Sequence, residues 1–160
     1  MRYDFNPDDK TKEAILNTVV YSGRFSDDES VKNLTVEEGI EEIAENAFRD
    51  FECLETVKLP KSLKKISASA FSGCKNLTRV EFCEGVTEIS DEAFAFCSSL
   101  TAVNMPNSVK RIGEGAFEGC ASLAKIKLSE SLLMIGASAF AFCIPKSPPC
   151  GTVYRRQGGC

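Results

Sequence analysis

The residues of this chain best suited to chemistry are its cysteines, which stand at Cys53, Cys74, Cys83, Cys97, Cys120, Cys143, Cys150 and Cys160. Thiols act as nucleophiles, form disulfides or bind soft metal ions, and their spacing decides among these uses. The chain has no C-x-x-C pair and no histidine, so the usual zinc-ligand spacings are absent. We therefore expect no metal site and no cofactor, and thiol or metal binding is the least favoured function.

One group of cysteines recurs at a fixed interval of 23 residues: Cys74, Cys97, Cys120 and Cys143. In a stack of repeats such residues lie about 4.8 Å apart with parallel side chains, an arrangement that suits a disulfide poorly. Phe51 precedes Cys74 by the same interval, which indicates an apolar slot. We predict buried thiols that pack as small hydrophobic side chains. On this view Cys97→Ser destabilises more than Cys97→Ala, because a hydroxyl in an apolar slot lacks a partner.

The other polar residues do not suggest catalysis. Without histidine, the chain contains neither a Ser-His-Asp nor a Cys-His arrangement. Carboxylates such as Glu41, Glu42 and Glu45 fall at positions where a solvated surface is expected. Gly113 and Gly115 belong to the repeat and do not form a phosphate-binding loop. We expect a protein that is not an enzyme.

A sequence repeat positions all of these residues. The pair Ala-Phe occurs at 47–48, 70–71, 93–94, 116–117 and 139–140, always 23 residues apart. A fixed period of this size is the signature of a solenoid, in which one short unit stacks on copies of itself. Five copies align without a gap, at 31–53, 54–76, 77–99, 100–122 and 123–145. We call these copies rungs one to five and number the positions of each rung from 1 to 23.

Eight columns of apolar residues run through the rungs and predict a buried core. Position four, for example, reads Leu34, Val57, Val80, Val103 and Ile126, and position thirteen is Ile in every rung. Alternation of polar and apolar residues at positions three to six predicts a strand, which Pro60 or Pro106 ends at position seven. Positions ten to thirteen predict a second short extended segment. Positions fourteen to twenty, rich in Ala, Ser and Glu, predict one or two helical turns.

The stretch from Leu100 to Cys120 fits the pattern L-x-x-V-x-L-P-x-S-V-x-x-I-G-x-x-A-F-x-x-C at nearly every position. This unit resembles the BspA-like class of leucine-rich repeats, and the resemblance covers residues 31–145. It implies an α/β repeat solenoid: a right-handed arc with a parallel sheet on its concave face, and short extended segments and helical turns on the other sides. It also implies a cell-surface or secreted microbial protein that binds other proteins, as in adhesion. It supplies no catalytic residues.

The two ends of the chain depart from the repeat. Residues 1–30 are expected to form an N-terminal cap with a degenerate half-repeat, because Val20 and Phe25 precede Ile43 and Phe48 by 23 residues. Two aspartates before residues 10–17 suggest a short helix there. Residues 146–160 are expected to form an irregular C-terminal tail after a proline-rich stretch. Whether Cys150 and Cys160 of this tail pair is left open.

Charge and hydropathy narrow the classes of partner. The net charge is −4, from 19 basic and 23 acidic residues that are interspersed, so nucleic acid is not an expected partner. No apolar run approaches the ~20 residues of a transmembrane helix. The first nine residues are acidic and do not resemble a signal peptide. A complete chain would accordingly be cytoplasmic, whereas the family resemblance implies the cell surface or secretion.

Two surfaces are candidates for binding a protein partner of unknown identity. The first is the polar strip, formed by positions three and five on the face that the resemblance makes concave. Its members are Asn33, Thr35, Thr56, Lys58, Arg79, Glu81, Ala102, Asn104, Lys125 and Lys127. We expect Arg79, Glu81, Asn104, Lys125 and Lys127 to carry binding, because solenoid curvature gathers several rungs into one surface.

The second surface is the edge patch, formed by Phe96, Leu133, Met134 and Phe142. Positions eleven and twelve carry charges of alternating sign in the earlier rungs, which we interpret as register-setting, but Leu133 and Met134 are apolar there. Exposed apolar groups of this kind often mark a contact. The patch suggests self-association through the C-terminal rung, or cover by the tail or by a further domain.

The sequence thus predicts a non-catalytic scaffold for protein–protein interaction, of an adhesion type by resemblance. The alternative is a structural spacer within a longer cell-surface protein, with no binding site of its own.

Overall fold

The computed structural model describes residues 13–16 and 31–143, and the structural statements below concern these ranges. The predicted tail at 146–160 and its cysteines lie outside them. So does most of the predicted N-terminal cap at 1–30, including the half-repeat residues Val20 and Phe25. These boundaries remain predictions.

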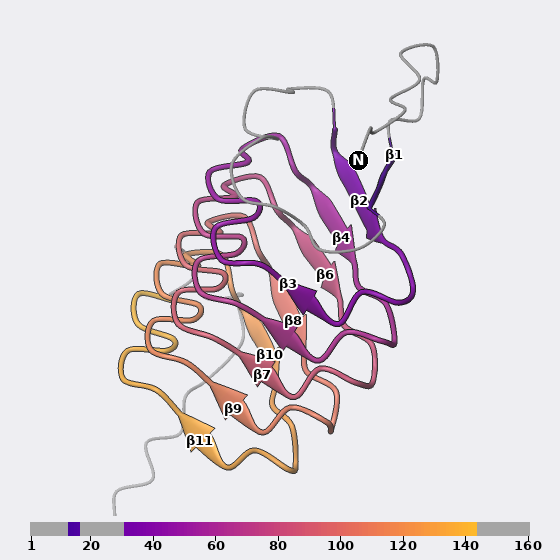
Figure 1. Ribbon diagram of the computed structural model, residues 1–160. Helices are drawn as coiled ribbons and strands as arrows, with labels where there is room; N and C mark the ends of the chain where they lie inside the picture. The colour runs from indigo at the N-terminus through magenta and orange to yellow at the C-terminus, as the bar shows by residue number, and fades with distance from the viewer. Residues whose placement is uncertain (1–12, 17–30, 144–160) are drawn as a thin grey trace, which may run out of the picture.

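The described residues form a solenoid in which each rung contributes one strand to each of two sides (Figure 1). One side, which we call the split sheet side, carries β1 (Glu13–Leu16), β2 (Asn33–Val36), β4 (Thr56–Lys58), β6 (Arg79–Glu81), β8 (Ala102–Asn104) and β10 (Lys125–Lys127). The other side, the long sheet, carries β3 (Glu42–Ile43), β5 (Lys65–Ile66), β7 (Glu88–Ile89), β9 (Arg111–Ile112) and β11 (Met134–Ile135).

All strand pairs are parallel, and their register confirms the repeat alignment. In the long sheet Ile43 pairs with Ile66, and Ile89 with Ile112, each partner 23 residues along the chain. The order of this sheet, β11-β9-β7-β5-β3, is continuous over five strands. The split sheet side is divided into a four-stranded sheet, β1-β2-β4-β6, and a two-stranded sheet, β10-β8. The strand pattern on this side is the same in every rung of the sequence, so the division between β6 and β8 was not foreseen.

The segment from position fifteen to twenty consists of turns, and no helix is assigned within the described residues. The predicted helical turns are not confirmed. The hydrogen bonds show why: alternate amides point in different directions. The amide of Ala47 donates to the Ala44 carbonyl of its own rung, but that of Phe48 donates to the Ala70 carbonyl of the next rung. A helix needs consecutive bonds within one segment, so stacking of the rungs replaces it with a third ladder of inter-rung bonds.

The core lies between these three ladders. The phenylalanines of position eighteen stack from rung to rung, with ring centroids 5.1 Å apart for Phe48–Phe71 and Phe71–Phe94, and 5.3 Å for Phe94–Phe117 and Phe117–Phe140. In rungs one to four the predicted apolar columns are buried, apart from the partly buried Phe82 at position six. The buried cluster is continuous along the stack, which agrees with a solenoid whose rungs cannot stand alone.

Two expectations need correction. The apolar columns were predicted to be buried in every rung, but in rung five Ile126, Leu128 and Ile135 are exposed by 41%, 40% and 48%. Each rung is covered by the next rung along the chain, and rung five has no such cover among the described residues. The short helix suggested at 10–17 is also wrong, because residues 13–16 form strand β1, which pairs in parallel with β2. Pairing with a neighbouring strand thus outweighs the local helix-start signal.

Candidate functional site

The polar strip lies on the split sheet side, and its central residues surround a cavity of about 590 Å³. The cavity is lined by the consecutive residues Thr78 to Phe82 of rung three and by Thr101, Ala102 and Asn104 of rung four. The structure therefore brings together three of the predicted binding residues, Arg79, Glu81 and Asn104. It places them at the division between β6 and β8.

Arg79 and Glu81 form an ion pair within β6, with Nη2 of Arg79 3.0 Å from Oε1 of Glu81. The two side chains remain exposed by 71% and 43%, so the pair is open to solvent and contributes little to stability. They point the same way because they are two residues apart on one strand. The pair offers a bidentate cation next to a carboxylate, groups that recognise charged and amide side chains.

Lys125 and Lys127 continue the strip on β10, beside the cavity. Their register partners on β8 are Ala102 and Asn104, and both lysines are exposed. Among the described residues neither forms an ion pair, whereas Arg79 does. Along the whole strip four side chains are basic (Lys58, Arg79, Lys125, Lys127) and one is acidic (Glu81). The strip is thus locally positive on a chain whose net charge is −4.

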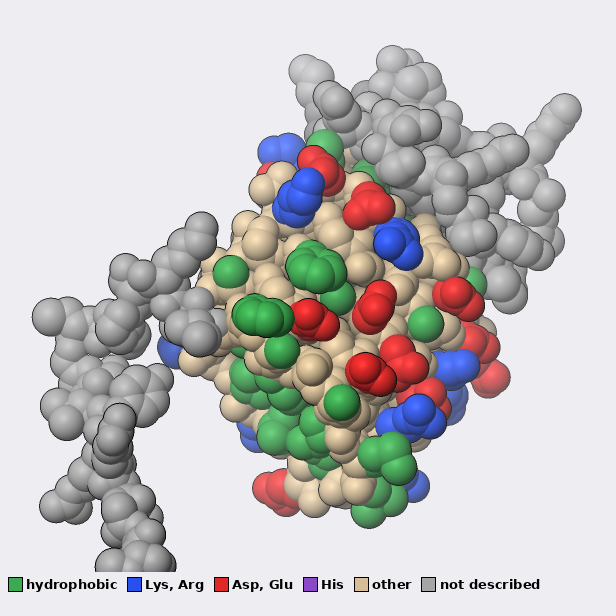
Figure 2. Space-filling view, turned by 90° about the vertical axis from the view of Figure 1, so that its left-hand side faces the viewer, with side chains coloured by type: hydrophobic (Ala, Val, Ile, Leu, Met, Phe, Trp, Pro, Cys, Tyr) green, Lys and Arg blue, Asp and Glu red, His purple; other side chains and the backbone are tan. Residues whose placement is uncertain are grey.

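The edge patch is not one continuous element: Phe96 lies in rung three, and the other three residues lie in rung five, on the long sheet side and in the turn segment. Leu133 and Met134 lie at the end of the long sheet, exposed by 82% and 57%. Phe96 and Phe142 belong to the turn segments and are exposed by 54% and 72%. Figure 2 looks onto the side formed by the turn segments, and hydrophobic side chains gather in its lower part, toward the last rungs.

Phe96 and Phe142 have unusual backbone conformations, with φ of 59° and 58°. This left-handed region is strained for a bulky side chain. The same position in rung four is Gly119, and a Cβ there would lie 2.6 Å from Cδ1 of Phe96. The ring of Phe96 therefore rests on a glycine of the next rung. Phe142 has no further rung beyond it among the described residues, which explains its greater exposure.

The cysteine column is buried as predicted, but its thiols are not simply hydrophobic. Cys74, Cys97 and Cys120 are fully buried and Cys143 is partly buried, and every described cysteine is free. Each of the four thiols donates to the carbonyl of a phenylalanine in the preceding rung, for example Cys97 to Phe71 at 3.2 Å. Sequence reasoning missed this partner because the carbonyl belongs to the backbone of another rung.

Burial controls the chemistry of these thiols. It raises the pKa of Cys74 to about 12 and that of Cys97 well above its ordinary value. A thiol with so high a pKa carries almost no thiolate near neutral pH and is a poor nucleophile. Among the described residues no group of three or more His, Cys, Asp or Glu side chains is placed to hold a metal ion.

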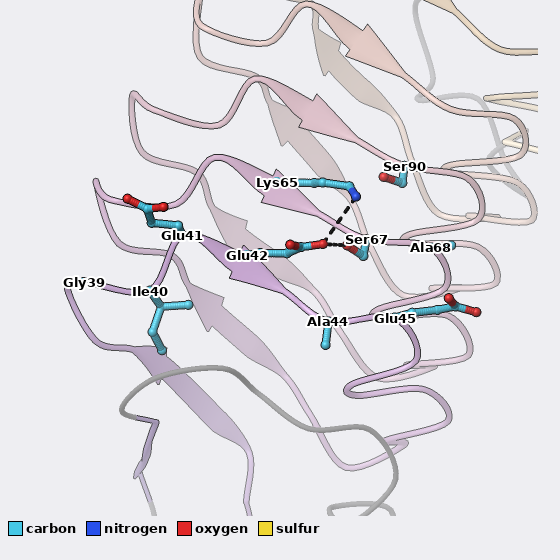
Figure 3. Close-up of a pocket in the computed structure, with 10 residues that line it drawn as sticks. All are labelled: Gly39, Ile40, Glu41, Glu42, Ala44, Glu45, Lys65, Ser67, Ala68 and Ser90. Carbon is cyan, nitrogen blue, oxygen red and sulfur yellow. Dashed lines mark hydrogen bonds and ion pairs between the residues drawn. The ribbon is translucent and has the colours of Figure 1, made fainter.

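A second cavity, of about 630 Å³, lies on the long sheet near rungs one and two (Figure 3). Its polar centre is Glu42, which accepts a hydrogen bond from Ser67 and lies 3.3 Å from the Lys65 amine. These two contacts hold the pKa of Glu42 below its ordinary value, the hydrogen bond from Ser67 contributing most. The Glu42 carboxylate is therefore already paired with Ser67 and Lys65 of rung two. The contact with Lys65 agrees with the register-setting interpretation of positions eleven and twelve.

No helix among the described residues is long and apolar enough to span a membrane. Comparison with known families gives one match, in which residues 18–145 fit six copies of the "BspA type Leucine rich repeat region". No curated protein sequence matches this chain significantly.

Several solved structures are similar. A leucine-rich repeat protein of T. pallidum is 32% identical, covers 89% of this chain and 64% of its own, and superposes with a TM-score of 0.70. A leucine-rich cell surface protein of Faecalibacterium prausnitzii is 27% identical, covers 71% of this chain and 37% of its own, and has a TM-score of 0.60. A leucine-rich repeat protein of Bacteroides ovatus is 32% identical, with coverages of 71% and 35% and a TM-score of 0.55. The chain thus spans between about a third and two thirds of the length of these proteins.

Proposed function

Since the chain belongs to the family of BspA-type leucine-rich repeat proteins, we propose that it is a non-catalytic scaffold that binds another protein through its polar strip. Leucine-rich repeat proteins commonly bind proteins, and the fold presents the strip as one surface built from all five rungs. The observation that carries the proposal is the placement of Arg79, Glu81 and Asn104 around one cavity, next to Lys125 and Lys127, which form no ion pair among the described residues.

The charge of the strip indicates the kind of partner. Four basic side chains against one acidic side chain favour a partner surface that is acidic, because complementary charge steers association and fixes orientation. Arginine is also enriched among the residues that dominate interface energies. The similar protein of Faecalibacterium prausnitzii is described as a cell surface protein. This supports a surface or secreted location, where adhesion-type binding would take place.

The edge patch is the second candidate surface, and the exposure of Leu133 and Phe142 favours it. If the polar strip is not used, the chain acts through this patch, by self-association or by contact with another protein. A spacer without any binding site is the remaining alternative.

The test is a selection of binders from a random-peptide display library on the native chain. The triple variant Arg79→Glu, Lys125→Glu, Lys127→Glu should weaken the selected binders at least tenfold, about 1.4 kcal/mol, with an almost unchanged melting temperature. Its matched control is Lys64→Glu, Lys110→Glu, Arg111→Glu, which reverses three exposed charges on the other side of the solenoid. Equal loss in both variants would indicate only a charge effect.

Serine substitutions at Phe96, Leu133, Met134 and Phe142 complete the test. Loss of binding in these variants alone would move the site to the edge patch. If the library yields no binder, the spacer hypothesis is favoured instead.

A further inference from the structure

The division of the split sheet side is a local opening, and it lies inside the proposed binding surface. At the junctions on either side the ladder is closed: the Thr78 and Arg79 amides donate to the Glu55 carbonyl, and the Ala124 and Lys125 amides donate to the Thr101 carbonyl. At the junction between rungs three and four the equivalent bonds to the Thr78 carbonyl are absent among the described residues, and β6 and β8 belong to different sheets.

The opening is confined to this one strand pair. On the long sheet β7 pairs with β9 in register, so the same two rungs are joined there. In the turn segment the Phe94 amide donates to the Ala116 carbonyl at 2.8 Å, so they are joined there as well. The stack itself is therefore intact, and only the face that carries the polar strip is open.

Phe82 explains why the opening occurs at this junction. Position six is otherwise Val36, Leu59, Met105 or Leu128, and the first three are buried. The ring of Phe82 is only partly buried and meets Phe94 edge-on at 5.9 Å. Both faces of Phe94 are already occupied by the phenylalanines above and below it, so the interior has no room for another ring.

The neighbouring strand residue shows the same effect. Val80 of β6 is 7% exposed, whereas the equivalent Val57 and Val103 are 1% and 0% exposed. An oversized side chain at position six thus keeps β6 from closing onto β8. The space left on the outer face is the cavity of about 590 Å³, which falls within the roughly 300–1,000 Å³ of ligand sites.

We call the opening between β6 and β8, together with the cavity over it, the cleft. The walls of the cleft carry main-chain groups without partners among the described residues. By analogy with the closed junctions, the Thr78 and Asn104 carbonyls are free acceptors, and the Ala102 and Phe82 amides are free donors, among the described residues. Free main-chain groups that line a cavity can bond to the polar groups of a bound segment. The charged groups beside them are Arg79, Lys125 and Lys127, against the single carboxylate of Glu81, and this excess of positive charge favours acidic side chains.

We propose that the cleft over β6 and β8 binds a short, extended, acidic segment of the partner protein, which lies on the outer face and bonds to these free main-chain groups from there. This inference rests on the proposed function and specifies what the polar strip recognises. Phe82 is the residue that keeps the cleft open, and it is a positioning residue in this sense.

Amide hydrogen exchange tests the opening without any ligand. The amides of Phe82 and Ala102 should exchange at least tenfold faster than those of Leu59 and Lys125, their counterparts at closed junctions. Phe82→Leu, which gives rung three the residue of rung two, should slow exchange at Ala102 at least tenfold. Met105→Leu is the control, since it changes the same position of a closed junction. Fast exchange at Ala102 in the Phe82→Leu protein would overturn the role of Phe82.

Binding is tested with an octapeptide of alternating Glu and Val, and with a counterpart in which Lys replaces Glu. The acidic peptide should shift the amide resonances of β6 and β8 and should bind Phe82→Leu at least tenfold more weakly than the native chain or Met105→Leu. The basic peptide should not bind. Equal affinity for all three proteins, or no shift in β6 and β8, would overturn the proposal.

The outcome separates this inference from the proposed function. If library-selected binders are lost in the triple charge variant but bind Phe82→Leu normally, the polar strip stands as the binding surface and the cleft does not. If neither variant affects the binders, the polar strip is not the binding surface, and the proposed function fails with the cleft.

Discussion

Rungs two to four and rung five share one sequence pattern, yet they differ in burial. At position four Val103 is fully buried and Ile126 is 41% exposed; at position thirteen Ile112 is fully buried and Ile135 is 48% exposed. Both residues of each pair are strongly apolar, so hydrophobicity alone does not decide burial. The difference teaches that in this fold a residue is buried by the next rung along the chain. Stability should therefore be distributed unevenly along the stack.

The largest expected effect contrasts two phenylalanines of the same column. Phe94→Ala should cost about 3–5 kcal/mol, because the cavity that it opens has packed rings on both sides. Among the described residues Phe140 stacks on Phe117 alone, and it is partly buried. Phe140→Ala should therefore cost less than half as much. Urea unfolding of both variants measures the two values.

Equal losses in the two variants would mean that rung five is covered in solution as fully as rung three. A loss below about 1 kcal/mol for Phe94→Ala would contradict the stacked core itself. Because the total stability of such a domain is about 5–15 kcal/mol, the Phe94 variant should remain measurable only at low temperature or in a stabilising buffer.

The second effect concerns alkaline pH and the buried thiols. Burial raises the pKa of Cys74 from 9.0 to about 12, so the folded state holds this proton more tightly than the unfolded state does. The resulting stability is fully present below pH 9 and is lost as the pH rises toward 12. At pH 10 the loss is on the order of 1 kcal/mol for this thiol. Cys74→Ala should reduce the loss of stability between pH 8 and 10, measured by urea unfolding.

Cys53→Ala is the control, since Cys53 is only partly buried and lies outside the cysteine column. It should leave the alkaline loss of stability nearly unchanged. If Cys74→Ala also leaves it unchanged, the folded and unfolded states hold this proton equally tightly, and burial does not raise the pKa of Cys74.

The repeat made much of the fold predictable, because a period of 23 residues fixes which residues stack. The strand positions, the register and the buried columns of rungs one to four could be derived from it. The turn segment could not, because its amides bond to another rung and local composition carries no such information. Nor could the exposure of Ile126, because burial at that position requires a covering rung and is not set by the residue type.

The candidate site was predictable in part. The strand alternation placed Arg79, Glu81 and Asn104 on one outward face, and the structure gathers them around one cavity. The cavity itself depends on Phe82, whose type alone does not reveal that the interior beside Phe94 is full. The edge patch was chosen for its apolar residues, but the left-handed backbone of Phe96 and Phe142 was not visible in the sequence.

A smaller effect distinguishes serine from alanine in the cysteine column. The sequence suggested that Cys97→Ser is worse than Cys97→Ala, but the premise is wrong, because the Phe71 carbonyl accepts a bond from this thiol. A serine hydroxyl at that place has the same acceptor. We now expect Cys97→Ser to be as stable as Cys97→Ala or more stable, by about 0.5–1.5 kcal/mol. At Cys143 water can reach the slot, so the two substitutions should differ by less. Thermal unfolding of the four variants decides this.

The smallest effect is expected at the exposed end of the long sheet. Leu133 and Met134 are exposed by 82% and 57%, so the double change Leu133→Ser, Met134→Ser should alter the free energy of unfolding by no more than about 0.5 kcal/mol. The matched control is Lys110→Ser, Arg111→Ser, which changes the same positions of rung four. A loss above about 1 kcal/mol in the rung-five variant alone, measured by urea unfolding, would mean that these residues are covered in solution. If that loss also grows with protein concentration, the cover is a second copy of the chain, since only an intermolecular contact depends on concentration.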